Sequence, residues 1–292
     1  MLISIIIPTF NRSREVEILV NSLIAQEASS NYEIIIVNDG STDNTIENLK
    51  KFKDNEIIKI YTIKNSERGA ARNFGAKMSS GKYLNFFDSD DIALSNHVGT
   101  AKDLIYKNTN IPVFHLSYKF KFNEYKSRAI VLSGIINNKI FLSNLLSCNG
   151  VFIRKDIFLK YNFSEDRVLS GSEDWFLWLQ IANNYNFLAS KEITSVIVDH
   201  QNRSMRAQQF DQIYNRINRL IENIDDISSE FSKSNLFKIK SQLYSFISMS
   251  SASLKKYKTL TIKFYLISLF YNPFTILNKR SINIMFNIFL RW

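Results

Sequence analysis

The hydrophobic positions in the first third of the chain form short, continuous apolar runs separated by longer amphipathic segments. The runs lie at 2–7, 33–37, 57–63 and 83–87. Runs of this length bounded by turn residues are typical of strands buried on both faces, as in a parallel sheet. Helical patterns lie between them, near 12–26, 43–53 and 67–79. Strand alternating with helix predicts βαβ units, and therefore a doubly wound α/β half over 1–92.

The remainder of the chain mixes the two periods and then becomes helical. Helices are expected near 97–107 and 172–184, and strands near 112–122, 128–135, 151–154 and 193–198. From about 207 onward the pattern is helical, with one interruption at Asn272-Pro273. The apolar run 264–271 is far shorter than the ~18 residues that a membrane-spanning helix needs. We therefore expect a body over 1–205 and a helical extension over 206–292.

Composition excludes several classes of protein. The chain has 292 residues and one cysteine, Cys148, so it has no intrachain disulfide and suits a reducing cytosol. The apolar N-terminus lacks a basic leader and reads as a buried strand rather than a signal peptide. Neither a Gly-x-Gly-x-x-Gly motif after the first strand nor a Gly-Lys-Ser/Thr loop is present, which argues against a dinucleotide enzyme and a P-loop NTPase.

The net charge of +10 lies almost entirely in the tail. Residues 231–292 contain ten Lys and Arg and no Asp or Glu, so residues 1–230 are about neutral. This distribution disfavours a nucleic-acid-binding body. The tail itself combines cations with aromatic residues, which suits a helical surface that meets anionic lipid.

The most acidic stretch follows the apolar run 83–87. Asp88, Asp90 and Asp91 place three carboxylates within four residues, and like charges at this density repel unless a cation lies among them. A strand end is also where open α/β sheets bind their ligands. The same residues equally suit a solvated turn that caps the next helix.

Three further motifs accompany this cluster, in a fixed order along the chain. They are Pro8-Thr9-Phe10-Asn11-Arg12, Val37-Asn38-Asp39-Gly40-Ser41 and Arg68-Gly69-Ala70-Ala71-Arg72-Asn73. In order and spacing the chain resembles the family 2 glycosyltransferases over about 1–205. The resemblance implies the GT-A fold, a doubly wound, Rossmann-like mixed sheet flanked by helices, with a nucleotide-binding half over 1–92 and an acceptor-binding half over 93–205.

The resemblance assigns the donor nucleotide-sugar to the strand ends. The residues implied are Pro8, Thr9, Phe10, Arg12, Asp39, Arg68, Asp88, Ser89, His200 and Arg203. Thr9 and Phe10 are expected against the base, and the Asp39 carboxylate is expected to accept the uracil N3–H, which indicates a UDP-sugar. The alternative for Asp39 is an Asx turn that it builds with Gly40. The alternative for Arg68 and Arg72 is that both are surface charges on a helix, and this interpretation is favoured more for Arg72 than for Arg68.

The metal and the general base follow from the same resemblance. Mn²⁺ or Mg²⁺ is expected on Asp90 and Asp88, with Asp91 in support and His200 as a further ligand. Ile92-Ala93-Leu94-Ser95 stands where the family often has a proline, and Ile197-Val198-Asp199 where it usually has Tyr-Arg before the His.

Asp174 is the expected general base, with Glu173 orienting it or the acceptor. Ser172-Glu173-Asp174 also suits a helix N-terminus, where hydroxyl and carboxylate groups cap and complement the dipole. His97 and His115 lie outside any motif and are interpreted as structural. Trp175 and Trp178 suit the core better than a sugar platform.

The tail and the resemblance together predict the setting of the reaction. Leu260, Phe264, Ile267, Phe270 and Tyr271 are expected to form an apolar helix face. We expect a cytoplasmic enzyme that is peripheral on the inner membrane and adds a hexose, with inversion, to a polyprenyl-diphosphate-linked saccharide of O-antigen or capsule. The alternative for the tail is a hairpin that packs on the body or on a second subunit, as in a homodimer.

Three rival functions remain open at this stage. The first is a non-catalytic nucleotide-sugar-binding or scaffold protein, which the intact Asp88, Asp90 and Asp174 oppose. The second is a nucleotidyltransferase, which needs a glycine-rich loop after the first strand that the chain lacks. The third is a nucleic-acid binder that acts through the tail.

Overall fold

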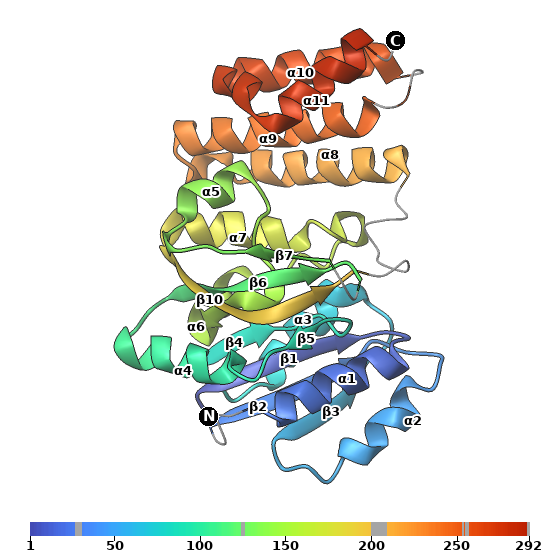
Figure 1. The fold of residues 1–292 in the computed structure, drawn as a ribbon, viewed down its shortest axis with the longest axis vertical. Coiled ribbons are helices and arrows are strands. Elements are labelled where there is room, and N and C mark those ends of the chain that lie inside the picture. The colour runs from blue at the N-terminus through green and yellow to red at the C-terminus, as the bar shows by residue number, and fades with distance from the viewer. Residues whose placement is uncertain (27–30, 124–125, 200–208, 253, 255–256, 291–292) are drawn as a thin grey trace. The chain divides into compact units, whose positions relative to one another are not determined.

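The computed structural model describes residues 1–26, 31–123, 126–199, 209–252, 254 and 257–290 (Figure 1). The chain divides into two compact units. Unit 1 comprises Met1–Asn137 and Leu145–Arg203, and unit 2 comprises Asn138–Asn144 and Ser204–Trp292.

One mixed sheet organises the described part of unit 1. Its strand order is β3-β2-β1-β4-β9-β6-β10-β5, with β7 paired to β6 and β8 paired to β10. The strands are β1 (Ile3–Thr9), β2 (Tyr32–Asn38), β3 (Ile58–Thr62), β4 (Tyr83–Phe86), β5 (Ile92–Ala93), β6 (Val113–Lys121), β7 (Ser127–Ile130), β8 (Gly134–Ile135), β9 (Val151–Arg154) and β10 (Phe187–Val198).

Strands β1 to β4 are parallel, as their continuous apolar sequences predict. Every residue of β1, β2 and β4 is buried, because helices cover both faces. The helices are α1 (Ser13–Ile24), α2 (Thr45–Leu49) and α3 (Glu67–Met78). The chain moves outward from β1 to β3 and then returns past β1 to β4, so right-handed crossovers place α1 and α3 on opposite faces (Figure 1). The direction of winding changes between β1 and β4, which is where such sheets bind ligands.

The second half of unit 1 extends the sheet with antiparallel neighbours. Strand β9 is antiparallel to both β4 and β6, and β10 is parallel to β6. The helices here are α4 (His97–Lys107), α6 (Lys155–Tyr161) and α7 (Glu173–Asn184). Strand β10 begins at Phe187, six residues before the expected strand 193–198. Exposed Lys191 and Glu192 and two shifts in register interrupt its apolar pattern, which explains why the sequence shows only its second part.

Unit 2 is helical, as predicted. It contains the short helix α5 (Asn137–Leu142) apart from its first residue, followed by α8 (Phe210–Asp226), α9 (Lys233–Ser251), α10 (Lys258–Tyr271) and α11 (Lys279–Leu290). Buried hydroxyl groups join α9 to α10: Ser248 donates to the carbonyl of Thr261 at 2.9 Å, and Ser241 to that of Ser268 at 2.9 Å. The predicted interruption is a 3₁₀ turn at Pro273–Leu277. Within the described ranges, no helix has the length and apolar character needed to cross a membrane.

Candidate active site

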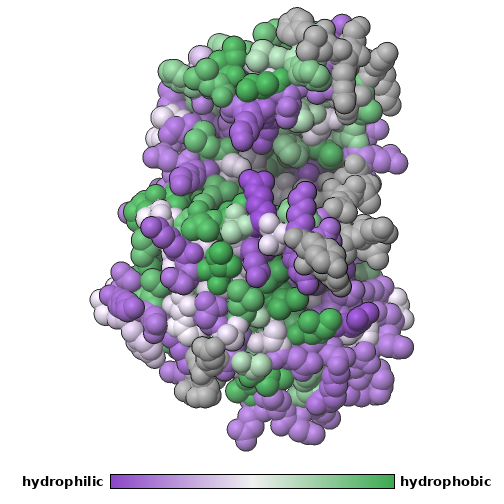
Figure 2. Space-filling view, in the orientation of Figure 1, coloured by the Kyte–Doolittle hydropathy of each residue, from purple (hydrophilic) through white to green (hydrophobic). Residues whose placement is uncertain are grey.

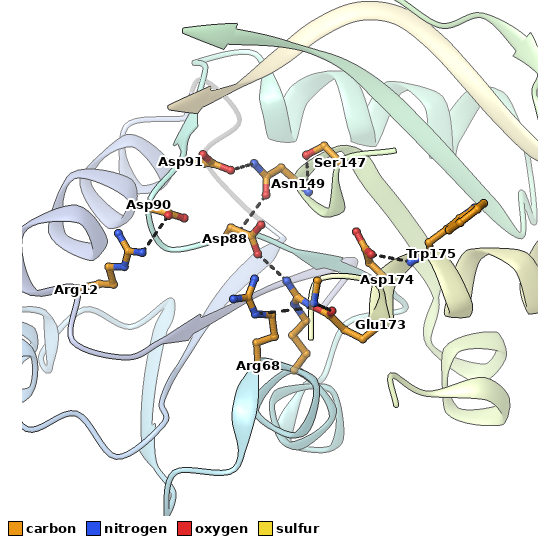
Figure 3. Close-up of polar contacts among 12 residues, drawn as sticks. Arg12, Arg68, Asp88, Asp90, Asp91, Ser147, Asn149, Glu173, Asp174 and Trp175 are labelled. Atoms are coloured by element: carbon orange, nitrogen blue, oxygen red, sulfur yellow. Dashed lines mark hydrogen bonds and ion pairs between the residues drawn. The ribbon is translucent and has the colours of Figure 1, made fainter. Parts of the chain in front are cut away.

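The acid cluster follows β4 and leads into β5, at the point where the sheet changes winding direction. Figure 3 shows the side chains of Asp88, Asp90 and Asp91 in this loop. The side chains of Asp88 and Asp90 remain 30% and 16% exposed, and Asp90 forms an ion pair with Arg12 at 3.4 Å. Asp91 is 2% exposed. The three carboxylates are therefore in different environments, two of them accessible to a ligand and one inside the protein.

Asp91 anchors the acid loop to the rest of the sheet. One of its oxygens accepts a hydrogen bond from Val198 N at 2.9 Å, and the other accepts from Asn149 Nδ2 at 2.7 Å. The Asn149 side-chain oxygen in turn accepts from the backbone N–H of Asp88 at 3.0 Å. Asn149 is completely buried, so this amide fixes both ends of the Asp88–Asp91 turn. Asn149 lies in the short 3₁₀ helix Cys148–Gly150, and no sequence motif marks it as a site residue.

Arg72 joins the acid loop to the start of α7. Its guanidinium donates to Asp88 Oδ1 at 2.6 Å and to Glu173 Oε1 at 2.9 Å, and the residue is 1% exposed. The guanidinium also lies over the Phe163 ring, 4.9 Å from its centroid. The interpretation of Arg72 as a surface charge is therefore wrong. Arg68, one helical turn earlier, has a side chain that is 35% exposed and lies 4.0 Å from the same Glu173 oxygen.

Two other residues of the Arg68–Asn73 motif explain how Arg72 becomes buried. The amide of Asn73 donates to the carbonyl of Phe163 and accepts from its N–H, at 2.9 and 3.0 Å. A Cβ atom on Gly69 would lie 2.3 Å from the carbonyl oxygen of Ser164, so only glycine permits this approach. Helix α3 is thereby fixed against the segment 163–165.

Glu173 and Asp174 begin α7 and have different surroundings. Glu173 is 3% exposed, and its second oxygen accepts from Gly171 N at 2.6 Å. Asp174 is partly exposed, and one of its oxygens accepts from Trp175 N at 2.7 Å. Burial and the neighbouring Glu173 carboxylate raise the pKa of Asp174 to about 6, against the lowering effect of Arg72. A carboxylate with a pKa in this range suits general base catalysis near neutral pH. The Ser172 side chain makes no capping hydrogen bond, so capping does not account for its place in this segment.

The strand ends of β1 and β2 form the other side of the site. Thr9 is 2% exposed, and its hydroxyl has no hydrogen-bond partner among the described residues, whereas Phe10 is 44% exposed. Asp39 is 4% exposed and accepts from Ser66 N at 2.8 Å. The side chain that bonds the backbone of this turn is Asn38, which accepts from Ser41 N at 3.1 Å, so the turn does not explain Asp39. Burial raises the pKa of the Asp39 carboxyl, although backbone N–H donors oppose the shift.

The other sequence-predicted residues fall into four groups. Pro8 is buried within β1 and Ser89 is 8% exposed in the acid loop. His200 and Arg203 lie outside the described residues. His97 and His115 are fully buried, and burial lowers the pKa of each to about 3, which is consistent with structural roles. Trp175 and Trp178 are buried, as predicted for core residues.

The donor atoms of the site suit a divalent cation that is shared with a ligand. Within the described ranges, no three His, Cys, Asp or Glu side chains gather as a protein-built metal cage. Asp88 and Asp90 supply hard oxygens, and Mg²⁺ is commonly held by one or two carboxylates together with substrate phosphates and water. The pair therefore fits Mn²⁺ or Mg²⁺. Both oxygens of Asp91 already accept hydrogen bonds from the chain, so we expect Asp91 to support the loop.

The chain is similar in sequence to known glycosyltransferases. Residues 4–160 match the profile of glycosyl transferase family 2. An uncharacterized glycosyltransferase of Rickettsia bellii is 31% identical over 205 residues, which are 68% of this chain but only 29% of that protein. The Escherichia coli protein WfgD, a UDP-Glc:alpha-D-GlcNAc-diphosphoundecaprenol beta-1,3-glucosyltransferase, is 28% identical over 64% of this chain and 72% of its own length.

A solved structure confirms the predicted fold. Residues 1–349 of Staphylococcus aureus TarS, in complex with UDP-GlcNAc, superpose with a TM-score of 0.71 at 18% identity, covering 99% of this chain and 89% of that one. The mixed sheet flanked by helices is thus the GT-A fold. The family profile covers more than half of the chain, and on this basis the protein belongs to glycosyl transferase family 2.

Proposed function

We propose that this protein is an inverting, metal-dependent glycosyltransferase that moves a hexose from a UDP-sugar to a saccharide acceptor. The contact of Arg72 with both Asp88 and Glu173 carries the proposal, because it brings the expected donor loop and the expected base segment together. Glycosyl transfer needs these two groups side by side, one for the diphosphate and one for the acceptor hydroxyl.

The donor would bind along the ends of β1, β2 and β4. The exposed Phe10 ring offers an apolar face for a base, and the Thr9 hydroxyl, which has no partner in the part of the chain that the structure describes, offers a polar contact. Asp39 is held by Ser66 N and offers a carboxylate that can accept the uracil N3–H. Arg12 and Arg68 are partly exposed cations beside the acids, where a diphosphate needs charge compensation. TarS, whose fold this chain shares, has been solved with UDP-GlcNAc.

The reaction itself would use Asp174. Its carboxylate takes the proton of the acceptor hydroxyl as the hydroxyl oxygen bonds to the anomeric carbon, and the bond from that carbon to the UDP oxygen breaks on the opposite side. Attack opposite the leaving group inverts the anomeric configuration. Glu173 is held by Arg72 and Gly171 N, and so fixes the first turn of α7 that carries Asp174. A divalent cation on Asp88 and Asp90 would neutralise the charge that develops on the departing diphosphate.

The acceptor is proposed from the chemistry of the relatives and from the tail. WfgD is named for transfer to a GlcNAc-diphosphoundecaprenol, a saccharide on a polyprenyl diphosphate. We infer an acceptor of this class, in the assembly of a bacterial surface polysaccharide. Such an acceptor is anchored in a membrane, so the enzyme would work at the cytoplasmic face of the inner membrane.

A donor panel tests this proposal. The protein is mixed with Mn²⁺, a short polyprenyl-diphosphate GlcNAc and each of several UDP-, GDP- and dTDP-sugars, and nucleoside diphosphate release is measured. We expect release from a UDP-sugar, loss of activity on chelation, and a product of inverted configuration by NMR. Asp174→Asn should abolish release, whereas Asp54→Asn, an exposed control in unit 1, should leave it unchanged. A non-catalytic protein would bind UDP but show no release with any sugar.

A further inference from the structure

Unit 2 carries a set of large apolar side chains that its helices leave in solvent. The exposed fractions are 78% for Phe270, Phe274 and Leu277, 59% for Leu266, 56% for Ile282 and 51% for Phe286. We call these six residues the C-terminal apolar surface. They lie on α10, on the 3₁₀ turn Pro273–Leu277 and on α11, and the turn contacts both helices. In Figure 2 hydrophobic side chains gather at the top of the view, where Figure 1 places α10 and α11.

This surface differs from the helix face expected from the sequence. Phe264 is 7% exposed and stacks on Tyr244 at 5.8 Å between ring centroids, and Tyr271 stacks on the same ring at 5.8 Å. These aromatic residues pack α10 against α9, and Phe264 is buried between them. Phe270 alone of the expected five is largely exposed, and the other members of the surface are Leu266 on α10 and residues of the turn and of α11. The six residues of the C-terminal apolar surface are instead each more than half exposed to solvent.

The helices and the turn that carry this surface contain charged residues of one sign only. Residues 231–292 contain no Asp or Glu, and Lys258, Lys263 and Lys279 are exposed on α10 and α11. Isolated apolar residues on a surface are ordinary, but a group of large ones indicates an interaction site. Aromatic and aliphatic side chains beside lysines are typical of helices that lie in a membrane interface, where lysines meet anionic headgroups. A second copy of this chain would bring like charges together.

We propose that the C-terminal apolar surface docks on a lipid bilayer rich in anionic headgroups, with Phe270, Phe274 and Leu277 inserted and the three lysines at the headgroups. The inference rests on the proposed function in one respect, because docking on the membrane would bring the proposed enzyme to its lipid-anchored acceptor. Binding to lipid needs neither donor nor acceptor, however, so it can be tested apart from catalysis.

Vesicle flotation with the full chain tests the proposal. Vesicles of phosphatidylethanolamine and phosphatidylglycerol are compared with vesicles of phosphatidylcholine, at about 0.15 M salt. We expect at least about tenfold tighter binding to the anionic vesicles. The triple variant Phe270→Ser/Phe274→Ser/Leu277→Ser should lose about tenfold or more of this binding. The variant Lys258→Glu/Lys263→Glu/Lys279→Glu should lose the preference for anionic lipid.

Matched controls come from unit 1. Tyr106, Val131 and Ile135 are 63%, 52% and 58% exposed, so Tyr106→Ser/Val131→Ser/Ile135→Ser removes a comparable exposed apolar set elsewhere. Lys53→Glu/Lys107→Glu reverses exposed lysines outside the tail. Neither control should change lipid binding. Transfer to a water-soluble acceptor should be equal in the wild type and in the Phe270 triple variant, which shows that the variant is folded.

Three results would overturn the proposal. They are equal binding to neutral and anionic vesicles, undiminished binding of the Phe270 triple variant, and a dimer in light scattering that this triple variant dissociates. The last result would assign the surface to a second copy of the chain. If vesicle binding holds but no UDP-sugar is turned over, the proposed function fails while the docking surface stands.

Discussion

Arg72 and Glu173 are 101 positions apart in the sequence, yet their side chains meet at 2.9 Å with both residues almost fully buried. The same guanidinium bonds Asp88 at 2.6 Å. One cation therefore stabilises two carboxylates that belong to the two expected halves of the reaction. Breaking such a buried pair leaves a charge without its partner, which is far more costly than losing a surface ion pair.

Replacing Arg72 should affect stability and the pH profile together. Arg72→Met leaves Glu173 buried without its cation, so we expect a loss of about 3 kcal/mol in the free energy of unfolding, measured by chemical denaturation. Arg72 also lowers the pKa of Asp174, so the acidic limb of the activity profile should move to higher pH. Arg72→Lys retains the charge and should keep the limb near its original position while lowering kcat. Arg128→Met, at an exposed site, should change neither the free energy of unfolding nor the acidic limb of the pH profile.

The pH dependence of transfer should report Asp174. Its pKa of about 6 means that activity falls as the pH drops through 6, because a protonated carboxyl cannot accept the acceptor's proton. Glu173 raises this pKa, so Glu173→Gln should shift the acidic limb of kcat/KM to lower pH. An acidic limb that stays in place in both Glu173→Gln and Arg72→Met would assign it to another group.

Asp174→Asn should separate activity from stability. A carboxyl whose pKa is raised by folding adds stability below its unfolded pKa, and that stability is lost as the pH rises through about 6. At pH 7 the wild type therefore carries a penalty that the neutral amide lacks. We expect the inactive Asp174→Asn variant to be more stable by on the order of 1 kcal/mol at pH 7, with no difference near pH 4. Denaturation curves at the two pH values measure this.

Asp90 and Asp91 are adjacent but should respond in opposite ways to the same change. Asp90→Asn alters a partly exposed carboxylate, so stability should change by less than about 1 kcal/mol while Mn²⁺-dependent transfer falls by about tenfold or more. Asp91→Asn places an NH₂ group against a buried N–H donor and should cost about 1–3 kcal/mol of stability. Equal loss of stability in both variants would contradict the assignment of Asp91 as the structural member.

Base selection should depend on Asp39. Asparagine keeps an oxygen that can accept from Ser66 N but has no second acceptor for the uracil N3–H. Asp39→Asn should therefore raise KM for the UDP-sugar by about 10- to 100-fold with little change in kcat. UDP binding by calorimetry provides a second measurement. Comparable binding of UDP by the wild type and by the variant would remove Asp39 from the base contact.

The sequence predicts the elements of this fold well because its buried strands are continuous apolar runs. Strands β1 to β4 lie where those runs predict them, and the reversal of winding places Asp88–Asp91 at the switch between β1 and β4. Strand β10 is predicted only in part, because exposed Lys191 and Glu192 interrupt its pattern. A charged pair of this kind is typical of a loop, and only the partner strands show that it continues a sheet.

The residues that the sequence analysis misses are those whose role depends on contacts distant in the chain. Arg72 lies on α3, a helix whose sequence is mostly polar. It is buried because segment 163–165 packs against α3 at Gly69 and Asn73. The four-residue spacing from Arg68 is the one local signal for it. Asn149 bonds Asp91, which is 58 positions earlier, and a single buried amide leaves no pattern of charge or hydropathy.

The side-chain amide of Asn149 fixes the direction of two hydrogen bonds that hold the acid loop. It donates on the side of Asp91 and accepts on the side of the Asp88 N–H. No other side chain of the same size can do both, since aspartate lacks the donor and leucine lacks both groups. The smallest chemical change at this position, NH₂ to O⁻, would direct a new carboxylate at Asp91 and reverse the sign of that contact. A side chain of the same shape would therefore not restore these contacts. The direction of the two hydrogen bonds, and not the space available, limits which residues can replace Asn149.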